Sequence, residues 1–375
     1  MRYVGMVLVV CLMMVPTIVG AQATVAADVV SIERAKVIDV QNEHTKTIVG
    51  TDTQAPIQTL TAQVLSGDQV GKIVTFENDY TQLAKGDQFY IRHQSNSVEG
   101  TEYWVVSDPY RLDVLGVLAG LFLVLLFVFG GIQGVRGLAS LIGSVVLILY
   151  VLLPGILAGY SPVLVSVGVA GLIIVLGSYV THGFTKTTSA AVVGMLVTVV
   201  CVGIATYWAI HAGRLSGYSG DEQVYLNFDT KGGINMVGLL FGGVMIGLLG
   251  VLYDIAIGQA VAVEELYRAG THLSRRDIYK RSIRIGREHI GALVNTLAIA
   301  YVGVALPLLL LIQHSSTAKL PVMINSELFA TEIIRVLVGG IGIILAVPIT
   351  TYIATYLVRP TRISEREGVQ HSHRH

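Results

Sequence analysis

Long apolar stretches separated by short polar segments dominate the chain after residue 113. Each stretch holds roughly twenty residues with few or no charges, which is the length a helix needs to cross the hydrocarbon core of a bilayer. The pattern predicts transmembrane helices near 114–132, 138–157, 162–181, 189–210, 234–256, 290–312 and 331–357. We therefore predict an α-helical polytopic membrane protein with a seven-span transmembrane bundle.

Residues 1–23 have the layout of a secretory signal peptide. Arg2 precedes an apolar run that ends near Val19, and small residues follow. We predict cleavage after Ala23, with Ala27 as the alternative site. An uncleaved membrane anchor is the other interpretation. Both place the next segment outside the cytoplasm.

Residues 31–109 are polar and contain short runs rich in β-branched and aromatic residues, with turn signals between them. This alternation predicts a small all-β extracytoplasmic domain, either an OB-like or an SH3-like barrel. Tyr90, Tyr103 and Trp104 lie in these runs, where they either pack the core or line a ligand surface. Strand aromatics usually pack, so the core interpretation is favoured.

Composition indicates the class of protein, and the placement of basic residues predicts its orientation in the membrane. Apolar residues make up 53% of the chain and charged residues 13%, and Lys+Arg equals Asp+Glu at 25 each, which indicates a membrane protein and no nucleic-acid partner. Three basic residues lie in the loops predicted to be outside, Arg214, Lys231 and Lys319. Many more lie in those predicted to be inside: Arg136, Lys186, Arg268, Arg275, Arg276, Lys280, Arg281, Arg284, Arg287, Arg359, Arg362, Arg366 and Arg374. This bias predicts a cytoplasmic C-terminal tail, residues 358–375.

A cytoplasmic loop is predicted to form an amphipathic helix over 274–288. Ser274 followed by Asp277 resembles a capping box. Ile278 and Ile285 are expected on one side of this helix, and basic residues on the other. We predict that the helix lies on the inner leaflet and contacts lipid headgroups; a regulatory or partner-binding face is the alternative. The basic residues are Arg276, Lys280, Arg284 and Arg287.

Two acids follow the apolar part of the span at 234–256. Glu265 lies eleven residues after Asp254, which is about 20° round a continuous helix and about 16 Å along it. The carboxylates share a face, but they hold one proton or ion together only if the helix breaks at Gly258. Asp254 lies either inside the bundle, where an acid implies proton or cation carriage, or at the headgroup edge.

Other polar residues extend this candidate site. Asn295, near the inner start of the next span, is predicted to donate to Asp254, either within a polar site or as an interhelical clamp. His182 begins a short inner loop and either bridges to this region or is solvated. Three histidines alternate at the end of the chain, His371, His373 and His375. A solvated tail is favoured over metal capture there, and we predict no metal site and no cofactor.

Three segments resemble the YibE/F family of bacterial multi-pass membrane proteins: GSYVTHGFTKTT at 177–188, LYDIAIGQAVAVEEL at 252–266 and HIGALVNTLAIAYVGVALPLLLL at 289–311. The matching positions are Thr181, His182, Gly183, Asp254, Glu265, Leu266, Asn295, Thr296, Tyr301, Leu306 and Pro307. Glu264 departs from the pattern, in which a bulky residue precedes the Glu-Leu pair, and is interpreted as peripheral. The resemblance implies a YibE-type member in a bacterial plasma membrane, with a shorter YibF-like membrane protein as hetero-oligomer partner. It implies no biochemical activity.

Two hypotheses of function follow. In the first, the protein is a transport or permease-like component that moves or gates a small solute or ion through a polar locus at Asp254, Asn295 and Tyr301. In the second, it is a non-transporting assembly subunit whose outer β domain binds an envelope partner. An intramembrane enzyme is disfavoured because the chain has neither a His-Glu-x-x-His zinc helix nor a Gly-x-Ser-x-Gly elbow.

Overall fold

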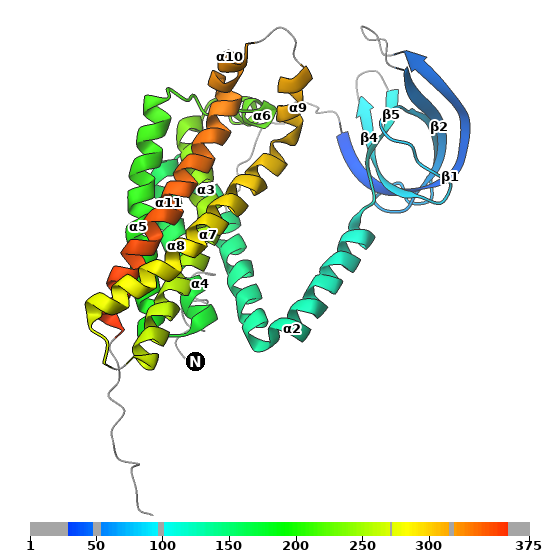
Figure 1. The fold of residues 1–375 in the computed structure, drawn as a ribbon. Helices are drawn as coiled ribbons and strands as arrows, with labels where there is room; N and C mark the ends of the chain where they lie inside the picture. The colour runs from blue at the N-terminus through cyan, green and yellow to red at the C-terminus, as the bar shows by residue number, and fades with distance from the viewer. Residues whose placement is uncertain (1–28, 48–53, 97–100, 271, 315–318, 359–375) are drawn as a thin grey trace, which may run out of the picture. The chain divides into compact units, whose positions relative to one another are not determined.

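The computed structural model describes residues 29–47, 54–96, 101–270, 272–314 and 319–358 (Figure 1). The chain divides into two compact units, Met1–Val124 and Leu125–His375, which are described separately. The predicted signal peptide and the C-terminal histidines lie outside the described residues.

The first unit contains one antiparallel sheet in the order β3-β2-β1-β4-β5. Its strands are β1 (Val29–Thr47), β2 (Gln54–Val64), β3 (Ile73–Asn78), β4 (Gln88–Asn96) and β5 (Thr101–Pro109). The sheet curls until β3 and β5 approach each other, although they form no ladder of hydrogen bonds with each other. The predicted β domain is therefore confirmed as a half-barrel.

Alternating residues of the curled sheet fill its interior, as a half-buried antiparallel sheet requires. The core consists of Ala35, Val37, Leu60, Ala62, Val74, Leu83, Phe89 and Ile91. Trp104 packs against this core from β5, as predicted. Tyr103, the next residue back along β5, points outward and is 58% exposed, so the core interpretation is wrong for it. The reason is the strand period of two, which turns neighbouring residues to opposite faces.

Charged side chains close the gap between the two edge strands. Lys72, just before β3, forms an ion pair with Glu102 of β5 at 2.9 Å (Nζ to Oε2). The Lys72 ammonium also lies 5.0 Å from the centre of the Trp104 ring. Its hydrogen bond is the main cause that lowers the pKa of the Glu102 carboxyl. Both partners are well exposed, so the pair contributes little to the free energy of unfolding.

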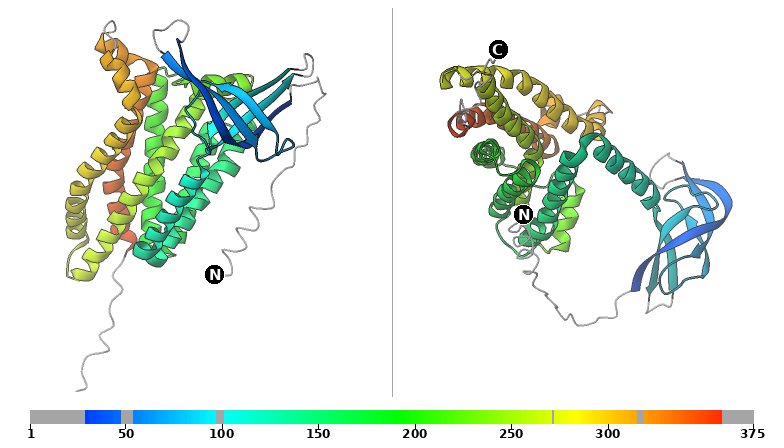
Figure 2. Two further views of the ribbon diagram at one scale, coloured as in Figure 1. Left: turned by 90° about the vertical axis from the view of Figure 1, so that its right-hand side faces the viewer. Right: turned by 90° about the horizontal axis from the view of Figure 1, so that it is seen from below.

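The second unit is a bundle of helices (Figures 1 and 2). The helical segments of the chain are α2 (Leu112–Leu147), η1 (Ile148–Leu152), α3 (Leu153–Leu157), α4 (Pro162–His182), α5 (Lys186–Ala212), α6 (Asp221–Asp229), α7 (Met236–Ala269), α8 (Arg275–Val304), α9 (Leu306–His314), α10 (Leu320–Asn325) and α11 (Glu327–Leu357). Within the described residues, five helical runs are long and apolar enough to cross a membrane. These are Leu112–Leu157 and the helices α4, α5, α7 and α11.

The predicted count of seven spans is not confirmed, for two reasons. The first two predicted spans form one helical run of 46 residues, Leu112–Leu157. That run is broken at Gly131, whose φ of 52° and ψ of −144° are not helical. The predicted span 290–312 is divided between α8 and α9, because α8 ends at Val304.

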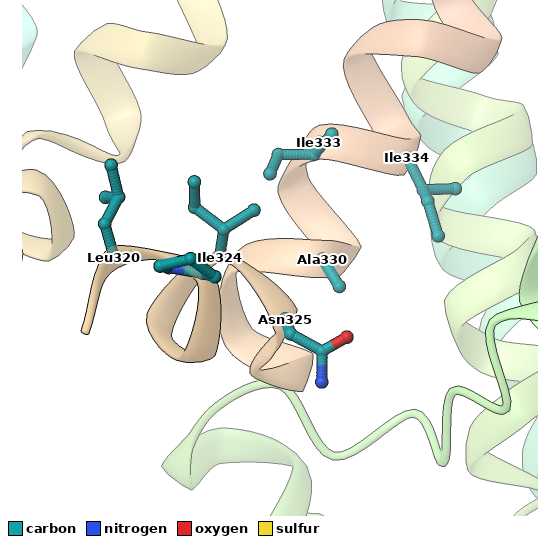
Figure 3. Close-up of a pocket in the computed structure, with 7 residues that line it drawn as sticks. Leu320, Ile324, Asn325, Ala330, Ile333 and Ile334 are labelled. Carbon is teal, nitrogen blue, oxygen red and sulfur yellow. The ribbon is translucent and has the colours of Figure 1, made fainter. Parts of the chain in front are cut away.

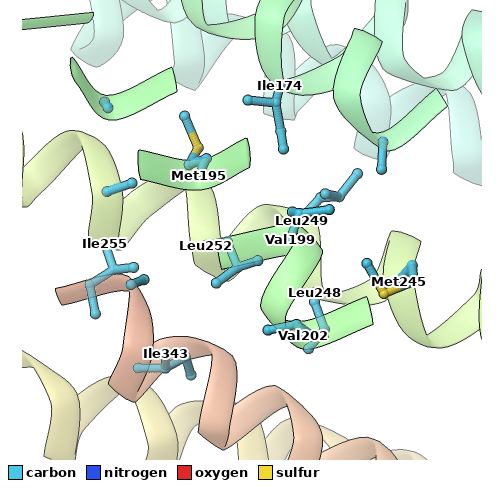
Figure 4. Packing of buried hydrophobic residues seen from close by; sticks show 14 of the residues in the cluster. Ile174, Met195, Val199, Val202, Met245, Leu248, Leu249, Leu252, Ile255 and Ile343 are labelled. Carbon is cyan, nitrogen blue, oxygen red and sulfur yellow. The ribbon is translucent and has the colours of Figure 1, made fainter. Parts of the chain in front are cut away.

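Helices α4, α5, α7 and α11 meet in one apolar core, in which side chains from all four point toward one another (Figure 4). Its centre includes Ile174, Met195, Val199, Val202, Met245, Leu248, Leu252 and Ile343. Small residues allow the helices to approach closely, as is usual within membranes. At Gly194 of α5, an added Cβ would lie 2.9 Å from the Thr350 Cα of α11. The bundle is therefore tightly packed along the α5–α11 contact.

One carboxylate fixes the start of α11. Glu327 accepts hydrogen bonds from Ser216 N at 2.8 Å, Gly217 N at 2.7 Å and Ser216 Oγ at 2.7 Å. Gly217 has a φ of +85°, and a side chain there would collide with the backbone of Met236 at the start of α7. The loop after α5 thus connects the starts of α7 and α11.

The predicted cap at Ser274 is confirmed, and its removal gives a testable prediction. Ser274 Oγ accepts from Asp277 N at 3.2 Å and donates to Asp277 Oδ2 at 2.6 Å, which lowers the pKa of the Asp277 carboxyl. We expect Ser274→Ala to destabilise the first turn of α8 by about 1 kcal/mol, since a backbone donor loses its partner. Hydrogen exchange of the amides at 275–279 in the purified protein would measure this, with the exposed Ser326→Ala, which has no side-chain capping bond, as control.

Candidate functional site

Helix α7 carries both acids singled out in the sequence. Asn235 caps it by accepting from Gly238 N at 2.9 Å, and the helix then continues unbroken from Met236 to Ala269. The break envisaged at Gly258 is absent. Asp254 and Glu265 therefore share one face and remain about 16 Å apart along the axis, too far to act as a pair.

That face has an unusual composition. Between Gly243 and Arg268 the exposed residues of α7 fall every third or fourth position, on a single stripe. Four are glycines, and two of the others are the acids. The stripe, termed the glycine face, consists of Gly243, Gly247, Gly250, Asp254, Gly258, Val261, Glu265 and Arg268. Among the described residues, nothing beyond the neighbouring turns of α7 itself lies within 4 Å of the Cβ position at Gly243, Gly250 or Gly258, so the face is open along much of its length.

Helix α4 lies on one side of the glycine face. Tyr253 Oη donates to Gly177 O of α4 at 3.4 Å, and the Tyr253 ring lies 5.9 Å from the ring of His182. Because Tyr253 precedes Asp254, His182 is placed in the neighbourhood of that acid. The bridging interpretation of His182 is thus compatible with the geometry, although the structure gives it a ring contact and no ion pair within the described residues.

Asp254 and Glu265 differ in what surrounds them. Asp254 is exposed and has neither a hydrogen bond nor an ion pair within the described residues. Glu265 is exposed as well, but it pairs with Arg268 at 3.0 Å. Of the two acids, Asp254 is the one whose charge is free to bind something else.

Glu264 is not peripheral, contrary to the interpretation from the sequence. Its side chain is 28% exposed, and it accepts from Thr187 Oγ1 of α5 at 2.6 Å while pairing with Arg268 at 2.5 Å. A partly buried carboxylate is favoured when its oxygens have hydrogen-bond partners, and Thr187 and Arg268 are the partners of Glu264. Glu264 therefore joins α7 to the start of α5.

The predicted contact between Asn295 and Asp254 is not formed within the described residues. Asn295 and Thr296 are both exposed on α8, and Thr296 Oγ1 donates to Ala292 O of its own helix at 3.0 Å. The buried residue of this turn is Leu297. Asn295 lies two positions earlier, about 160° round the helix, so it points away from the bundle.

Tyr301 lies beside the glycine face, in a cluster that the sequence pattern did not reveal. Its hydroxyl would be 3.0 Å from a Cβ at Gly247, and the Arg335 guanidinium lies 5.8 Å from the centre of its ring. Arg335 Nη1 donates to both carboxylate oxygens of Glu332, at 2.9 and 3.1 Å. The sequence did contain a signal for this cluster. Glu332 and Arg335 both fall inside the predicted span 331–357, where ionisable groups are costly.

A second feature missed from the sequence is a buried amide. Gln259 of α7 is 2% exposed and accepts from Thr351 Oγ1 of α11 at 2.9 Å. Gly286 of α8 leaves the space for this amide, since a Cβ there would lie 2.6 Å from Gln259 Nε2. This contact joins three helices and fits an interhelical clamp.

The basic residues predicted to contact lipid lie on the exposed side of α8: Arg276, Lys280, Arg284 and Arg287. Ile278 is fully buried, as expected, but Ile285 is 39% exposed. Ser282 and Gly286 occupy the contact instead. The helix is not a separate element over 274–288, because α8 continues unbroken to Val304 and packs on α7 and α11.

Two shallow grooves lie on the surface of the bundle. The larger, of about 520 Å³, lies between α10 and α11 and is lined by Leu320, Pro321, Ile324, Asn325, Ala330, Ile333 and Ile334 (Figure 3). The smaller, of about 280 Å³, shares Ile334 and is wholly apolar. Neither lining contains a titratable residue, so neither supports acid–base chemistry.

Comparison with protein families gives two matches. The family described as YibE/F-like protein matches residues 118–360, and the YibE/F family N-terminal domain matches residues 29–98. Comparison with curated proteins and with solved structures gives no match. The two family matches together include strands β1 to β4 of the half-barrel and helix α7, which carries the glycine face, whereas β5 falls between the matched ranges.

Proposed function

Because this chain belongs to the YibE/F family, and because of the glycine face, we propose that it is a transport component of a membrane that moves or gates a small solute or ion. The five apolar helical runs support a membrane location. The carboxylates on the glycine face favour a cation or a proton as the transported species, since a carboxylate binds positive charge.

The glycine face is the observation that carries this proposal. An acid without a partner on a transmembrane helix is costly, and such residues commonly mark ion pathways. The glycines leave room beside α7, and the Tyr301 hydroxyl and then Asp254 provide polar groups along it. Gly247, next to the Tyr301 hydroxyl, and Asp254 are about 10 Å apart along the α7 axis, so the two polar groups follow each other along one face.

The proposal keeps the seven-span arrangement and its orientation. The break at Gly131 divides the run Leu112–Leu157 into segments of about 19 and about 26 residues, each long enough to cross a bilayer. The apolar end of α8 together with α9 provides the remaining span. An odd number of spans puts the β domain and the basic C-terminal tail on opposite sides, and the positive-inside rule puts the tail in the cytoplasm.

A bulky side chain introduced on the glycine face tests this function. We expect the purified protein in liposomes to conduct protons or alkali cations under an imposed potential, and Gly250→Phe to reduce that flux severely. The Cβ position of Gly250 is unobstructed, so the ring enters the pathway without disturbing the core. Gly168→Phe is the matched control, because Gly168 is an equally open glycine on α4. Wild-type flux no higher than that of protein-free vesicles, or equal flux in the two variants, contradicts the proposal.

A second function, that of an assembly subunit, is favoured by the outer surface of the half-barrel. Val30 and Ile32 of β1 and Tyr103 and Val105 of β5 are large, apolar and exposed on strands that flank β4. Such a patch is typical of a protein-binding surface. Under this proposal a YibF-like protein or another envelope protein co-purifies with the wild type. Loss of that protein on deletion of residues 31–109, with the bundle still folded, supports it; retention contradicts it.

A further inference from the structure

Aromatic and basic side chains gather at the end of the half-barrel where the chain enters the first apolar run. Only Tyr110 and Arg111 separate β5 from α2. Tyr110 N donates to Gln88 O at 2.9 Å, so the sheet is hydrogen-bonded up to this junction. The end of the sheet is thus held close to the start of α2, whatever angle the domain takes.

The length of this connection limits how far the residues around it can lie from the hydrocarbon core of the membrane. Two extended residues reach about 7 Å. The polar headgroup layer on each side of a bilayer is about 5–8 Å thick. If α2 enters the hydrocarbon core directly after Asp113, then Tyr110 lies within about 10 Å of that boundary, and the side chains that contact Tyr110 lie in the headgroup layer or at its edge.

Four side chains form this junction surface. Arg34 and Tyr90 are paired across β1 and β4. Both contact Tyr110: the Arg34 guanidinium lies 5.5 Å from the centre of its ring, and the rings of Tyr90 and Tyr110 are 5.8 Å apart. Lys36 follows on the same face of β1, exposed and opposite Gln88. Within the described residues, neither Arg34 nor Lys36 forms an ion pair, so their charges are uncompensated.

We propose that this junction surface, Arg34, Lys36, Tyr90 and Tyr110, binds phospholipid headgroups and seats the half-barrel on the membrane. Tyrosine is suited to the interface because its ring is apolar and its hydroxyl is polar. Arginine and lysine form charge-assisted hydrogen bonds to phosphate oxygens. Lipid is the occupant because the covalent link to α2 brings the surface to headgroup depth. This contact is separate from the one predicted for α8, and it does not depend on transport.

Fluorescence quenching in liposomes tests whether the half-barrel lies on the membrane surface. A fluorophore is attached to Ala84→Cys, an exposed position in the turn before β4, in a full-length chain whose natural cysteines are replaced by serine. The liposomes contain only this protein and phospholipids, part of which carry a nitroxide on the headgroup. We expect strong quenching in the parent protein. Part of the phospholipid is anionic. Each basic residue near an anionic surface adds about 1 kcal/mol, so Arg34→Gln with Lys36→Gln should lower the equilibrium constant for membrane contact about tenfold or more and reduce the quenching.

Arg92→Gln is the matched control. Arg92 is exposed on the same side of β4, two residues from Tyr90 and farther from the junction, and should leave the quenching unchanged. Elution volume and thermal unfolding of each variant establish that the β domain is intact. Weak quenching in the parent, or equal quenching in the parent and the double variant, overturns the proposal. The second result would mean that the link alone sets the position, or that a protein absent from the liposomes is the true occupant.

Discussion

Asp254→Asn is expected to abolish cation flux through the reconstituted protein while the bundle remains folded. The substitution keeps the shape of the side chain and removes its charge, and Asp254 has no partner within the described residues that depends on that charge. A side-chain amide neither gains nor loses a proton near neutral pH and binds a cation poorly, so we expect flux to fall more than about tenfold. Ion flux into liposomes loaded with a pH-sensitive or cation-sensitive dye measures it.

Glu265→Gln is the matched control for this experiment. Glu265 lies on the same glycine face, but it is paired with Arg268 at 3.0 Å and lies near the C-terminal end of α7. Its loss should change flux by less than about twofold, because an exposed pair of this kind contributes little. Full flux in Asp254→Asn rules out Asp254 as part of the pathway. Equal loss in both variants would show that the effect comes from the surface charge of α7 and not from a site.

One property of this site can be predicted from the sequence, and another cannot. The shared face of Asp254 and Glu265 follows from the 100° step of a helix, and the structure keeps it because α7 is continuous. The direction in which Asn295 points does not follow. It depends on how α8 is rotated against its neighbours, which packing at Ile278, Gly286 and Leu297 decides.

The errors in the fold have the same origin. A hydropathy pattern locates apolar stretches, but it does not show that Gly131 breaks one helical run or that α8 crosses a predicted loop boundary without interruption. The tendency of strand aromatics to pack placed Trp104 correctly in the core, but the alternation of side chains along a strand should have excluded its neighbour Tyr103. The pair of Glu332 and Arg335 was visible as two charges within an apolar stretch, whereas its contact with Tyr301 required the structure.

Replacing Gly194 by alanine is expected to destabilise the bundle strongly, although the substitution adds only one methyl group. The added Cβ would lie 2.9 Å from both the Cα and the Cβ of Thr350, and closer still to its hydroxyl. A backbone atom cannot rotate away as the end of a long side chain can, so α5 and α11 must separate. Overpacking of this kind typically costs about 1–3 kcal/mol. Unfolding of the purified protein in mixed micelles with increasing SDS measures the change.

Two further variants show whether the contact between Gly194 and Thr350 causes the loss of stability. Gly168→Ala adds the same methyl group to α4 at a position where no described residue of another helix lies within 4 Å. It should leave stability unchanged or slightly increased, because alanine favours the helix. Thr350→Ala removes the hydroxyl that is nearest to Gly194 but not the backbone contact. Combined with Gly194→Ala, it should recover part of the loss, since residues in contact give non-additive effects. Strict additivity of the two substitutions would mean that α5 and α11 do not meet at this point.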